Sequence, residues 1–315
     1  MPVVAPGKPG NPSAMVSLRS HLVTISLRAQ RSKRFYADPA VMRARLPKHQ
    51  SPHKTEPIRS VRRRVRVAES HVGQTRCYVL EPRSGAGSRR VLHLHGGGFV
   101  EQPEPHHWRF LRWLVEHADA TVVFPIYPLC PSAGHRRIRA CVRAVYDRYL
   151  ADHGGARYVF GDSAGGALTT DLVETLRRER GRLPTGLGLI SPWLDLAVAD
   201  PRSARIEPHD PELGIEGLRQ AGRWYAAGES LEDPGISPVH ADFTGFPPMV
   251  MFTGTRDILN PDARRLCDAA TASGVRVDFH EYDGMFHNWL MQPIPEGARA
   301  RAQVGRFFEE VFETV

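Results

Sequence analysis

A glycine-flanked serine is the first feature of this chain whose surroundings point to chemistry. Ser163 stands between Gly161 and Gly165, after the apolar run Tyr158 to Phe160 and before a segment with helical spacing. A strand, a sharp turn and a helix in this order are typical of a nucleophile elbow, in which glycines remove side chains that would collide in the turn. The pattern predicts Ser163 as a nucleophile, with an ordinary N-cap serine as the plain alternative.

A serine hydroxyl needs a base and an orienting carboxylate before it attacks a carbonyl carbon. His287 follows the last strand candidate and would lie at the same sheet end as the serine, although a solvated loop histidine would satisfy the same pattern. Asp257 follows the preceding strand candidate; its rival is Asp262, whose position after Pro261 suits the start of a helix. For an imidazole of ordinary pKa, we expect activity to fall below about pH 6 to 7.

A glycine-rich loop, "HGGGF", supplies backbone donors for a developing oxyanion. Gly96, Gly97 and Gly98 let their N–H groups approach a substrate oxygen without obstruction. His93 and His95 alternate along the preceding strand and suggest a metal site as an alternative, but no third ligand is evident in the sequence and the glycines would have no role. The chain order of serine, acid and histidine agrees with that of α/β-hydrolases.

The segments around these motifs alternate between apolar strand candidates and amphipathic helices. Apolar residues recur every three or four positions after Pro131, from Leu168 to Leu176 and from Ala300 to Val311. The order predicts an α/β fold with a mostly parallel sheet covered by helices on both faces. The strand candidates are "RRVRVAES", "QTRCYVLEP", "RRVLHLHG", "ATVVFPIY", "ARYVFG", "GLGLISP", "PPMVMFTGT" and "RVDFHEYDG".

Two regions without strand candidates divide the chain. We expect residues 13–60 and 197–236 to form a helical cap over the carboxyl ends of the strands, where open α/β sheets place their sites. Residues 61–196 and 237–315 then form the catalytic domain. Residues 1–12, which are rich in proline and glycine, are expected to be a disordered leader.

The net charge of +8 is concentrated near the N-terminus, where residues 1–66 hold 15 Lys and Arg and 2 Asp and Glu. In "SVRRRVRV" the residues Val61, Val65 and Val67 alternate with arginines as on a half-exposed strand, and no nucleic-acid-binding motif accompanies them. We therefore expect a solvated basic surface and no nucleic-acid partner.

The four scattered cysteines and the lack of a signal-peptide core or membrane span predict a cytoplasmic protein with reduced thiols.

Four motifs together resemble the hormone-sensitive-lipase-like branch of the α/β-hydrolases. They are "HGGGF", "GDSAGG", "FTGTRDIL" and "DGMFHNW", in this order, within about residues 60 to 315. The resemblance implies Ser163 as nucleophile, Asp257 as acid and His287 as base. It also implies oxyanion donors and supporting motif residues, with donors at Gly97, Gly98 and Ala164 and support from His95, Gly96, Gly161, Asp162 and Gly165.

The chain departs from the family pattern in two places. Where the family usually continues with Tyr-Arg-Leu-Ala-Pro-Glu, this chain has "YPLCPS", so Pro128 and Ser132 replace an arginine and a glutamate. The glycine that often follows shortly after HGGG is also missing from "HGGGFVEQ". These differences affect local ion pairs and the shape of the pocket entrance rather than the predicted chemistry.

The resemblance implies a serine carboxylesterase that works without a cofactor or metal on a small-molecule ester. Because the cap candidates are polar, with Arg202, Glu207 and Asp210 in one span, we expect short- to medium-chain acyl groups rather than an oil interface. An amide or formamide hydrolase is the main alternative, because one fold supports many acyl transfers. A non-catalytic small-molecule receptor is a second alternative, against which the presence of His287 argues. A homodimer is a further hypothesis about the assembly of the protein.

Overall fold

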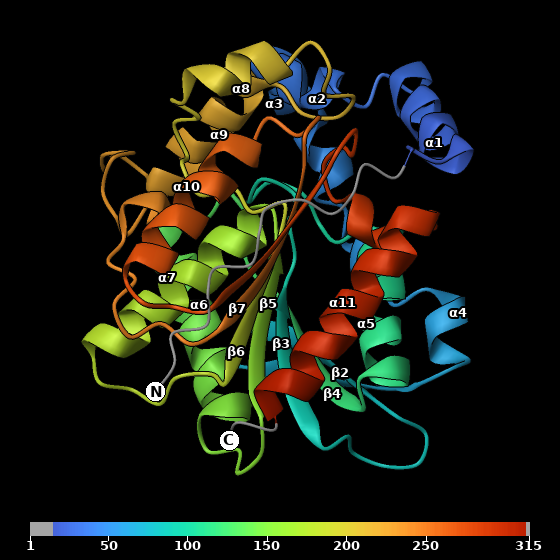
Figure 1. The fold of residues 1–315 in the computed structure, drawn as a ribbon, viewed down its shortest axis with the longest axis vertical. Coiled ribbons are helices and arrows are strands. Elements are labelled where there is room, and N and C mark those ends of the chain that lie inside the picture. The colour runs from blue at the N-terminus through green and yellow to red at the C-terminus, as the bar shows by residue number, and fades with distance from the viewer. Residues whose placement is uncertain (1–14, 313–315) are drawn as a thin grey trace.

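An eight-stranded sheet forms the centre of the molecule, for which the computed structural model describes residues 15–312 (Figure 1). The strand order is β1-β2-β4-β3-β5-β6-β7-β8, in which β1 pairs with β2 and β2 with β4 antiparallel, and all other neighbours are parallel. The predicted mostly parallel sheet is confirmed, and the leader predicted for residues 1–12 lies outside the described residues. The strands are β1 (Arg66–Val72), β2 (Thr75–Glu81), β3 (Arg89–Leu94), β4 (Ala120–Ile126), β5 (Arg157–Asp162), β6 (Gly186–Ile190), β7 (Met249–Gly254) and β8 (Val277–Tyr282).

Helices cover both faces of this sheet. Figure 1 shows α5 and α11 on one face and α6, α7 and α10 on the other. The α-helices are α1 (Leu18–Ala29), α2 (Arg34–Ala37), α3 (Pro39–His49), α4 (Arg59–Arg62), α5 (Pro105–His117), α6 (His135–Tyr146), α7 (Ala164–Arg178), α8 (Pro201–Ile206), α9 (Ile215–Ala226), α10 (Asn260–Ala272) and α11 (Pro295–Phe312). Shorter turns are the 3₁₀ helices η1 (Pro52–Thr55), η3 (Pro238–His240) and η4 (Trp289–Met291) and the π-helical η2 (Asp147–Ala151).

The central strands are apolar throughout because both of their faces are buried. In β5, Tyr158 and Phe160 pack on the side of α5 and α11, whereas Val159 points into the core on the side of α6 and α7. The ring of Tyr158 meets the ring of Phe308 edge to face, with 4.4 Å between centroids. Alternating side chains thus build two cores that hold β5 rigidly, and β5 is the strand that leads to Ser163.

Four helices, α2, α3, α8 and α9, lie at the carboxyl ends of the parallel strands, and we refer to them as the upper helices (Figure 1). Lys33, before α2, donates to the carbonyl groups of Glu207 and Asp210, which lie between α8 and α9. The two regions that were predicted to form a cap, residues 13–60 and 197–236, therefore contact each other here. The helices approach closely, since a Cβ on Gly217 of α9 would lie 2.1 Å from the carbonyl oxygen of Tyr36 in α2.

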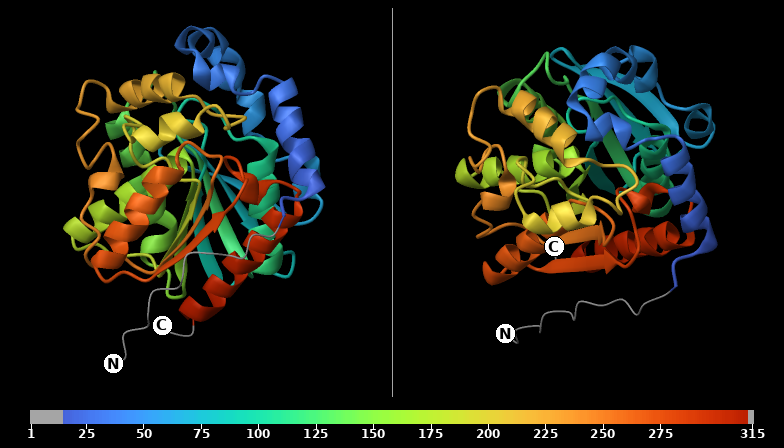
Figure 2. Two further views of the ribbon diagram at one scale, coloured as in Figure 1. Left: turned by 45° about the horizontal axis from the view of Figure 1, so that its top comes forward. Right: turned by 90° about the horizontal axis from the view of Figure 1, so that it is seen from above.

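Helix α1 lies apart from the upper helices, beside α11 at the edge of the molecule (Figure 2). At its start, the Ser17 and Ser20 hydroxyls donate to the Glu296 carboxylate over 2.9 and 2.7 Å. The N-terminal segment expected to form part of a cap thus divides in two, with α2 and α3 beside α9 and α1 anchored on α11.

The basic stretch "SVRRRVRV" is only partly a strand, so the strand interpretation of its first half is wrong. Residues Arg59–Arg62 form α4, and β1 begins only at Arg66. Val61 and Val65 are four residues apart, the spacing of one helical turn, and both are buried.

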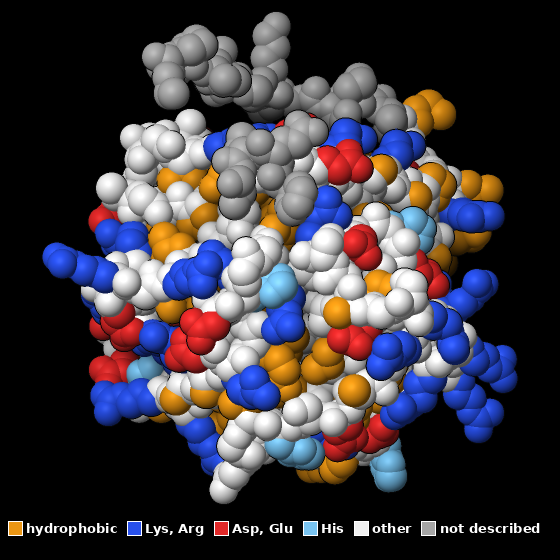
Figure 3. Space-filling view, turned by 90° about the horizontal axis from the view of Figure 1, so that it is seen from below, with side chains coloured by type: hydrophobic (Ala, Val, Ile, Leu, Met, Phe, Trp, Pro, Cys, Tyr) orange, Lys and Arg blue, Asp and Glu red, His pale blue; other side chains and the backbone are white. Residues whose placement is uncertain are grey.

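At the end of the molecule away from the upper helices, basic side chains are mixed with acidic ones and with small hydrophobic patches (Figure 3).

Packing between β5 and β6 generates a stability prediction. A Cβ on Gly188 would lie 2.1 Å from a ring carbon of the buried Phe160, so Gly188→Ala is expected to destabilise the fold by about 1–3 kcal/mol. Gly305→Ala is the matched control, because a Cβ in that position of α11 meets no atom within 4 Å. It should stabilise the helix by about 0.5–1 kcal/mol. Urea unfolding of both variants measures the difference, and equal effects would contradict the packing argument.

Candidate active site

Ser163 occupies the junction of β5 and α7 in a backbone conformation that residues other than glycine rarely adopt. Its φ is 51° and its ψ is −120°, and 3% of the residue is exposed. The turn is crowded: a Cβ on Gly165 would lie 1.9 Å from the carbonyl oxygen of Leu94, and a Cβ on Gly161 would lie 2.1 Å from that of Gly165. Larger residues at these two positions would therefore force the turn apart, as the sequence pattern predicted.

The turn after β8 brings His287 to the carboxylate of Asp257. The two atoms His287 Nδ1 and Asp257 Oδ2 are 2.9 Å apart, and both side chains are buried. Burial alone would lower the pKa of the His287 imidazole, but the charge of Asp257 and its hydrogen bond outweigh burial and raise that pKa to about 9. Among the described residues, the Ser163 hydroxyl has no hydrogen-bond partner, so the structure joins His287 to Asp257 by a hydrogen bond but does not join Ser163 to His287 by one.

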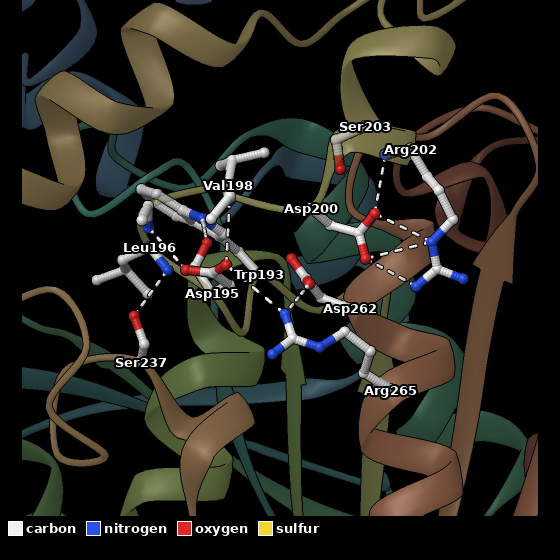
Figure 4. A network of polar contacts seen from close by, with 12 residues as sticks. Trp193, Asp195, Leu196, Val198, Asp200, Arg202, Ser203, Ser237, Asp262 and Arg265 are labelled. Carbon is white, nitrogen blue, oxygen red and sulfur yellow. Dashed lines mark hydrogen bonds and ion pairs between the residues drawn. The ribbon is translucent and has the colours of Figure 1, made fainter.

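Asp262, the rival acid, belongs to a different network (Figure 4). It lies on α10, where one of its oxygens pairs with Arg265 Nη1 over 3.0 Å and the other has no hydrogen-bond partner among residues 15–312. Burial and the neighbouring Asp195 carboxylate raise the pKa of Asp262 to about 7, although Arg265 opposes them. The Asp195 carboxylate in turn accepts from backbone N–H groups of the segment before α8. Of the two candidates, Asp257 is therefore the one that contacts His287.

The loop after β3 presents backbone N–H groups that have no acceptor of their own. Gly97 and Gly98 have φ values of 101° and 59°, which favour glycine, and the loop closes through hydrogen bonds from the N–H groups of Val100 and Glu101 to the Gly97 carbonyl. Within the described residues, the N–H groups of Gly97, Gly98 and Ala164 donate to no protein acceptor. Ala164 opens α7, whose N-terminus favours negative charge, so these three groups suit an oxyanion.

The carboxylate of Asp162 joins the elbow to β3, to α5 and to the turn that carries His287. It lies 3.2 Å from His93 Nε2 and from His107 Nε2, and it accepts from Asn288 Nδ2 over 2.9 Å. Burial favours the neutral acid, but His107 and His93 outweigh it and hold the pKa of Asp162 well below its usual range. Sequence reasoning missed His107 and Asn288, and only the adjacency of Asn288 to His287 hinted at a role.

The remaining motif residues support the glycine loop. His95 Nδ1 lies 2.7 Å from the Gly96 carbonyl oxygen, and its ring stacks on Tyr127 with 4.2 Å between centroids. Burial lowers the pKa of His95 to about 3, so the ring is neutral. A Cβ on Gly96 would lie 2.4 Å from an Asp162 carboxylate oxygen. Over residues 15–312 no group of three or more His, Cys, Asp and Glu side chains could hold a metal ion.

Two carboxylates next to the upper helices, those of Glu101 and Glu212, were not revealed by the motifs. Glu101, just beyond the glycine loop, accepts from the Tyr36 hydroxyl of α2 and bonds to His49 of α3. Glu212 precedes α9, and its carboxylate adds to the raised pKa of His287. Burial raises the pKa of Glu212 itself to about 7, while the charge of His287 acts in the opposite direction. The site therefore meets the upper helices through carboxylates.

Known proteins that are similar to this chain share its fold and are named as hydrolases or esterases. A family model described as alpha/beta hydrolase fold matches residues 91–291. An acetyl-hydrolase of Streptomyces hygroscopicus is 33% identical over 224 residues, which cover 70% of this chain and 75% of that protein. An esterase of Acinetobacter venetianus is 29% identical over 228 residues, or 70% of this chain and 75% of that protein.

Solved structures show the same likeness over nearly the whole chain. The crystal structure of an esterase from the bacterial hormone-sensitive lipase family superposes with a TM-score of 0.80 and 25% sequence identity, covering 95% of this chain and all of that one. The chain therefore belongs to the α/β-hydrolases, in their hormone-sensitive-lipase-like branch.

Proposed function

We propose that the protein is a serine carboxylesterase that hydrolyses short- to medium-chain acyl esters through an acyl-enzyme. The observation that carries the proposal is the 2.9 Å hydrogen bond between His287 and Asp257, on a turn that Asn288 ties to the residue beside Ser163. A carboxylate, an imidazole and a serine hydroxyl are the parts that acyl transfer by a serine requires. The esterase and acetyl-hydrolase relatives support the same class of reaction.

In the proposed first step, the Ser163 oxygen attacks the ester carbonyl carbon while its proton passes to His287 Nε2. The carbonyl oxygen becomes negative and accepts hydrogen bonds from the N–H groups of Gly97, Gly98 and Ala164. Each such donor typically lowers the barrier by about 2.7–4 kcal/mol. The C–O bond to the alcohol then breaks, and the alcohol leaves with the proton from His287.

The second step releases the acid. A water molecule gives its proton to the now neutral His287 and attacks the acyl carbon, and the bond to Ser163 breaks as the serine regains a proton. Throughout, Asp257 holds the imidazole in one tautomer and stabilises its charged form. No cofactor takes part in this scheme.

The surroundings of the loop after β3 support a small acyl group. Phe99, next to Gly98, stacks on Tyr225 of α9 with 4.0 Å between centroids, and both side chains are buried. Leu213 and Leu218 are buried as well, so the apolar residues of this region are already packed against one another rather than forming a broad open surface. An acyl chain gains about 0.8 kcal/mol per buried CH₂ only while room remains.

Labelling tests the assigned nucleophile. A fluorophosphonate should form a single adduct on Ser163, detectable by mass spectrometry of tryptic peptides. Ser163→Ala should fold normally and lose essentially all hydrolysis of p-nitrophenyl acetate, because the covalent step is removed. Ser273→Ala, at the far end of α10, is the control and should keep full activity. An adduct elsewhere, or an active Ser163→Ala variant, would overturn the assignment.

The raised pKa of His287 moves the expected pH dependence upward from that of an ordinary histidine. The proposed base works only when neutral, so kcat/KM should rise between pH 7 and the pKa of about 9. Asp257→Asn removes the group that raises this pKa; the acid limb should shift to lower pH while turnover falls by about 10⁴. Asp262→Asn is the control and should change neither, since Asp262 contacts Arg265. The reverse ranking of the two variants would make Asp262 the acid.

A panel of substrates tests the acyl preference. Activity on p-nitrophenyl esters should peak between acetate and octanoate and decline for longer chains, because the packed residues around Phe99 leave limited room. Anilides with the same acyl groups should be cleaved weakly. Highest activity on emulsified long-chain triglyceride contradicts the proposed chain length. Faster cleavage of an anilide than of the matching ester would instead favour an amide hydrolase.

A further inference from the structure

Helix α1 exposes an apolar face. Within the described residues, all of the large hydrophobic side chains that are strongly exposed lie between Met15 and Ile25. Three of them, Leu18, Leu22 and Ile25, are spaced by four and three residues and so form one stripe along the helix. The exposed fractions are 92% for Met15, 75% for Leu18, 56% for Leu22 and 61% for Ile25.

The opposite side of α1 is already docked, and it is docked largely through polar groups. Ser20 and Thr24 are buried, and the Ser20 hydroxyl donates to Glu296 over 2.7 Å. Val23 and Leu27 pack partly buried against the core beside them. The helix therefore turns two hydroxyl groups inward together with Val23 and Leu27, while Leu18, Leu22 and Ile25 face outward, which is unusual for a surface helix. An exposed apolar stripe of this kind indicates a surface that binds a partner.

The charges around the stripe indicate the partner. At 100° per residue, Arg19 lies on one side of the stripe and Arg28 on the other, and both are exposed. Residues 15–37 contain five Lys and Arg and no Asp or Glu. An apolar stripe flanked by basic side chains is the pattern of helices that lie in the plane of an anionic membrane surface.

We propose that α1 docks the protein on an anionic lipid surface, with Leu18, Leu22 and Ile25 inserted between lipids and the flanking arginines on the phosphate groups. The helix has 12 residues, and over residues 15–312 no helix is long and apolar enough to cross a bilayer, so the contact is interfacial. In Figure 1, α1 lies at the same end of the molecule as the upper helices, so docking brings the candidate site towards the lipid.

A second copy of the chain fits this face less well. Two α1 helices packed face to face would bring their basic residues together without any acidic residue of the segment to compensate. The stripe has only three large side chains, whereas a stable protein interface buries about 800 Å² and 20–30 residues on each partner. The opposite end of the molecule mixes both signs of charge (Figure 3), whereas residues 15–37 contain no acidic residue.

Vesicle flotation with the full chain tests the proposal. We expect binding to phosphatidylcholine vesicles that contain about 30% phosphatidylglycerol, little binding to phosphatidylcholine alone, and release as salt rises. The triple variant L18S/L22S/I25S should reduce the bound fraction about tenfold or more. The variant R19Q/R28Q should weaken binding to the anionic vesicles by a similar factor. R180Q/R182Q, which removes two exposed arginines from the loop after α7, is the matched control and should bind like the unaltered chain.

The result does not depend on the proposed esterase activity, because flotation measures binding alone. All variants should keep their circular dichroism spectrum and their melting temperature, since the altered side chains face away from the core. Equal binding of the triple variant and the unaltered chain overturns the proposal. So does concentration-dependent dimerisation that the triple variant abolishes without any vesicle binding, which would assign the face to a second copy. Vesicle binding that arises only after deletion of residues 1–14 would assign the face to that segment.

Discussion

A single buried carboxylate connects the parts of the proposed active site. Asp162 accepts from His93 in β3 and from His107 in α5, which are consecutive elements, and from Asn288 after β8, which is distant in the chain. A charge taken out of water is tolerated only when partners compensate for the lost hydration, so these donors must all be in place when the fold closes. Because Asp162 precedes Ser163 and Asn288 follows His287, the contact that satisfies the charge also brings the proposed nucleophile and base together.

The strained turn at Ser163 is held by hydrogen bonds on both sides of the residue. Its N–H donates to the Ile190 carbonyl, and its own carbonyl accepts from the N–H groups of Gly166 and Trp193, each over 2.9 Å. A positive φ outside glycine costs of order 1–3 kcal/mol and persists only where the surroundings over-determine the backbone. Here β6 and the start of α7 provide that support, so the hydroxyl is presented without depending on any ligand.

The upper helices contact the site at both of its edges. On one side, the Ser203 hydroxyl donates to the Ile258 carbonyl and the Ile258 N–H donates to Asp210, which pins the residue next to Asp257. On the other side, Tyr36 and His49 hold Glu101 beyond the glycine loop. A shift of these helices would therefore move the loop that carries Asp257 and the glycine loop together, whereas α1 is anchored separately on α11.

Local patterns in the sequence determined the class of fold and the position of the elbow. Strand and helix periodicity and the crowding relieved by Gly161 and Gly165 act between neighbours along the chain, so they can be read without coordinates. Tertiary structure alone decided which carboxylate meets which partner: Asp257 reaches His287, and Asp262 pairs with Arg265. It also decided that Val61 belongs to a helix and that α1 turns its apolar stripe outward. A side chain acquires its partner from packing between distant segments, and no local spacing records that choice.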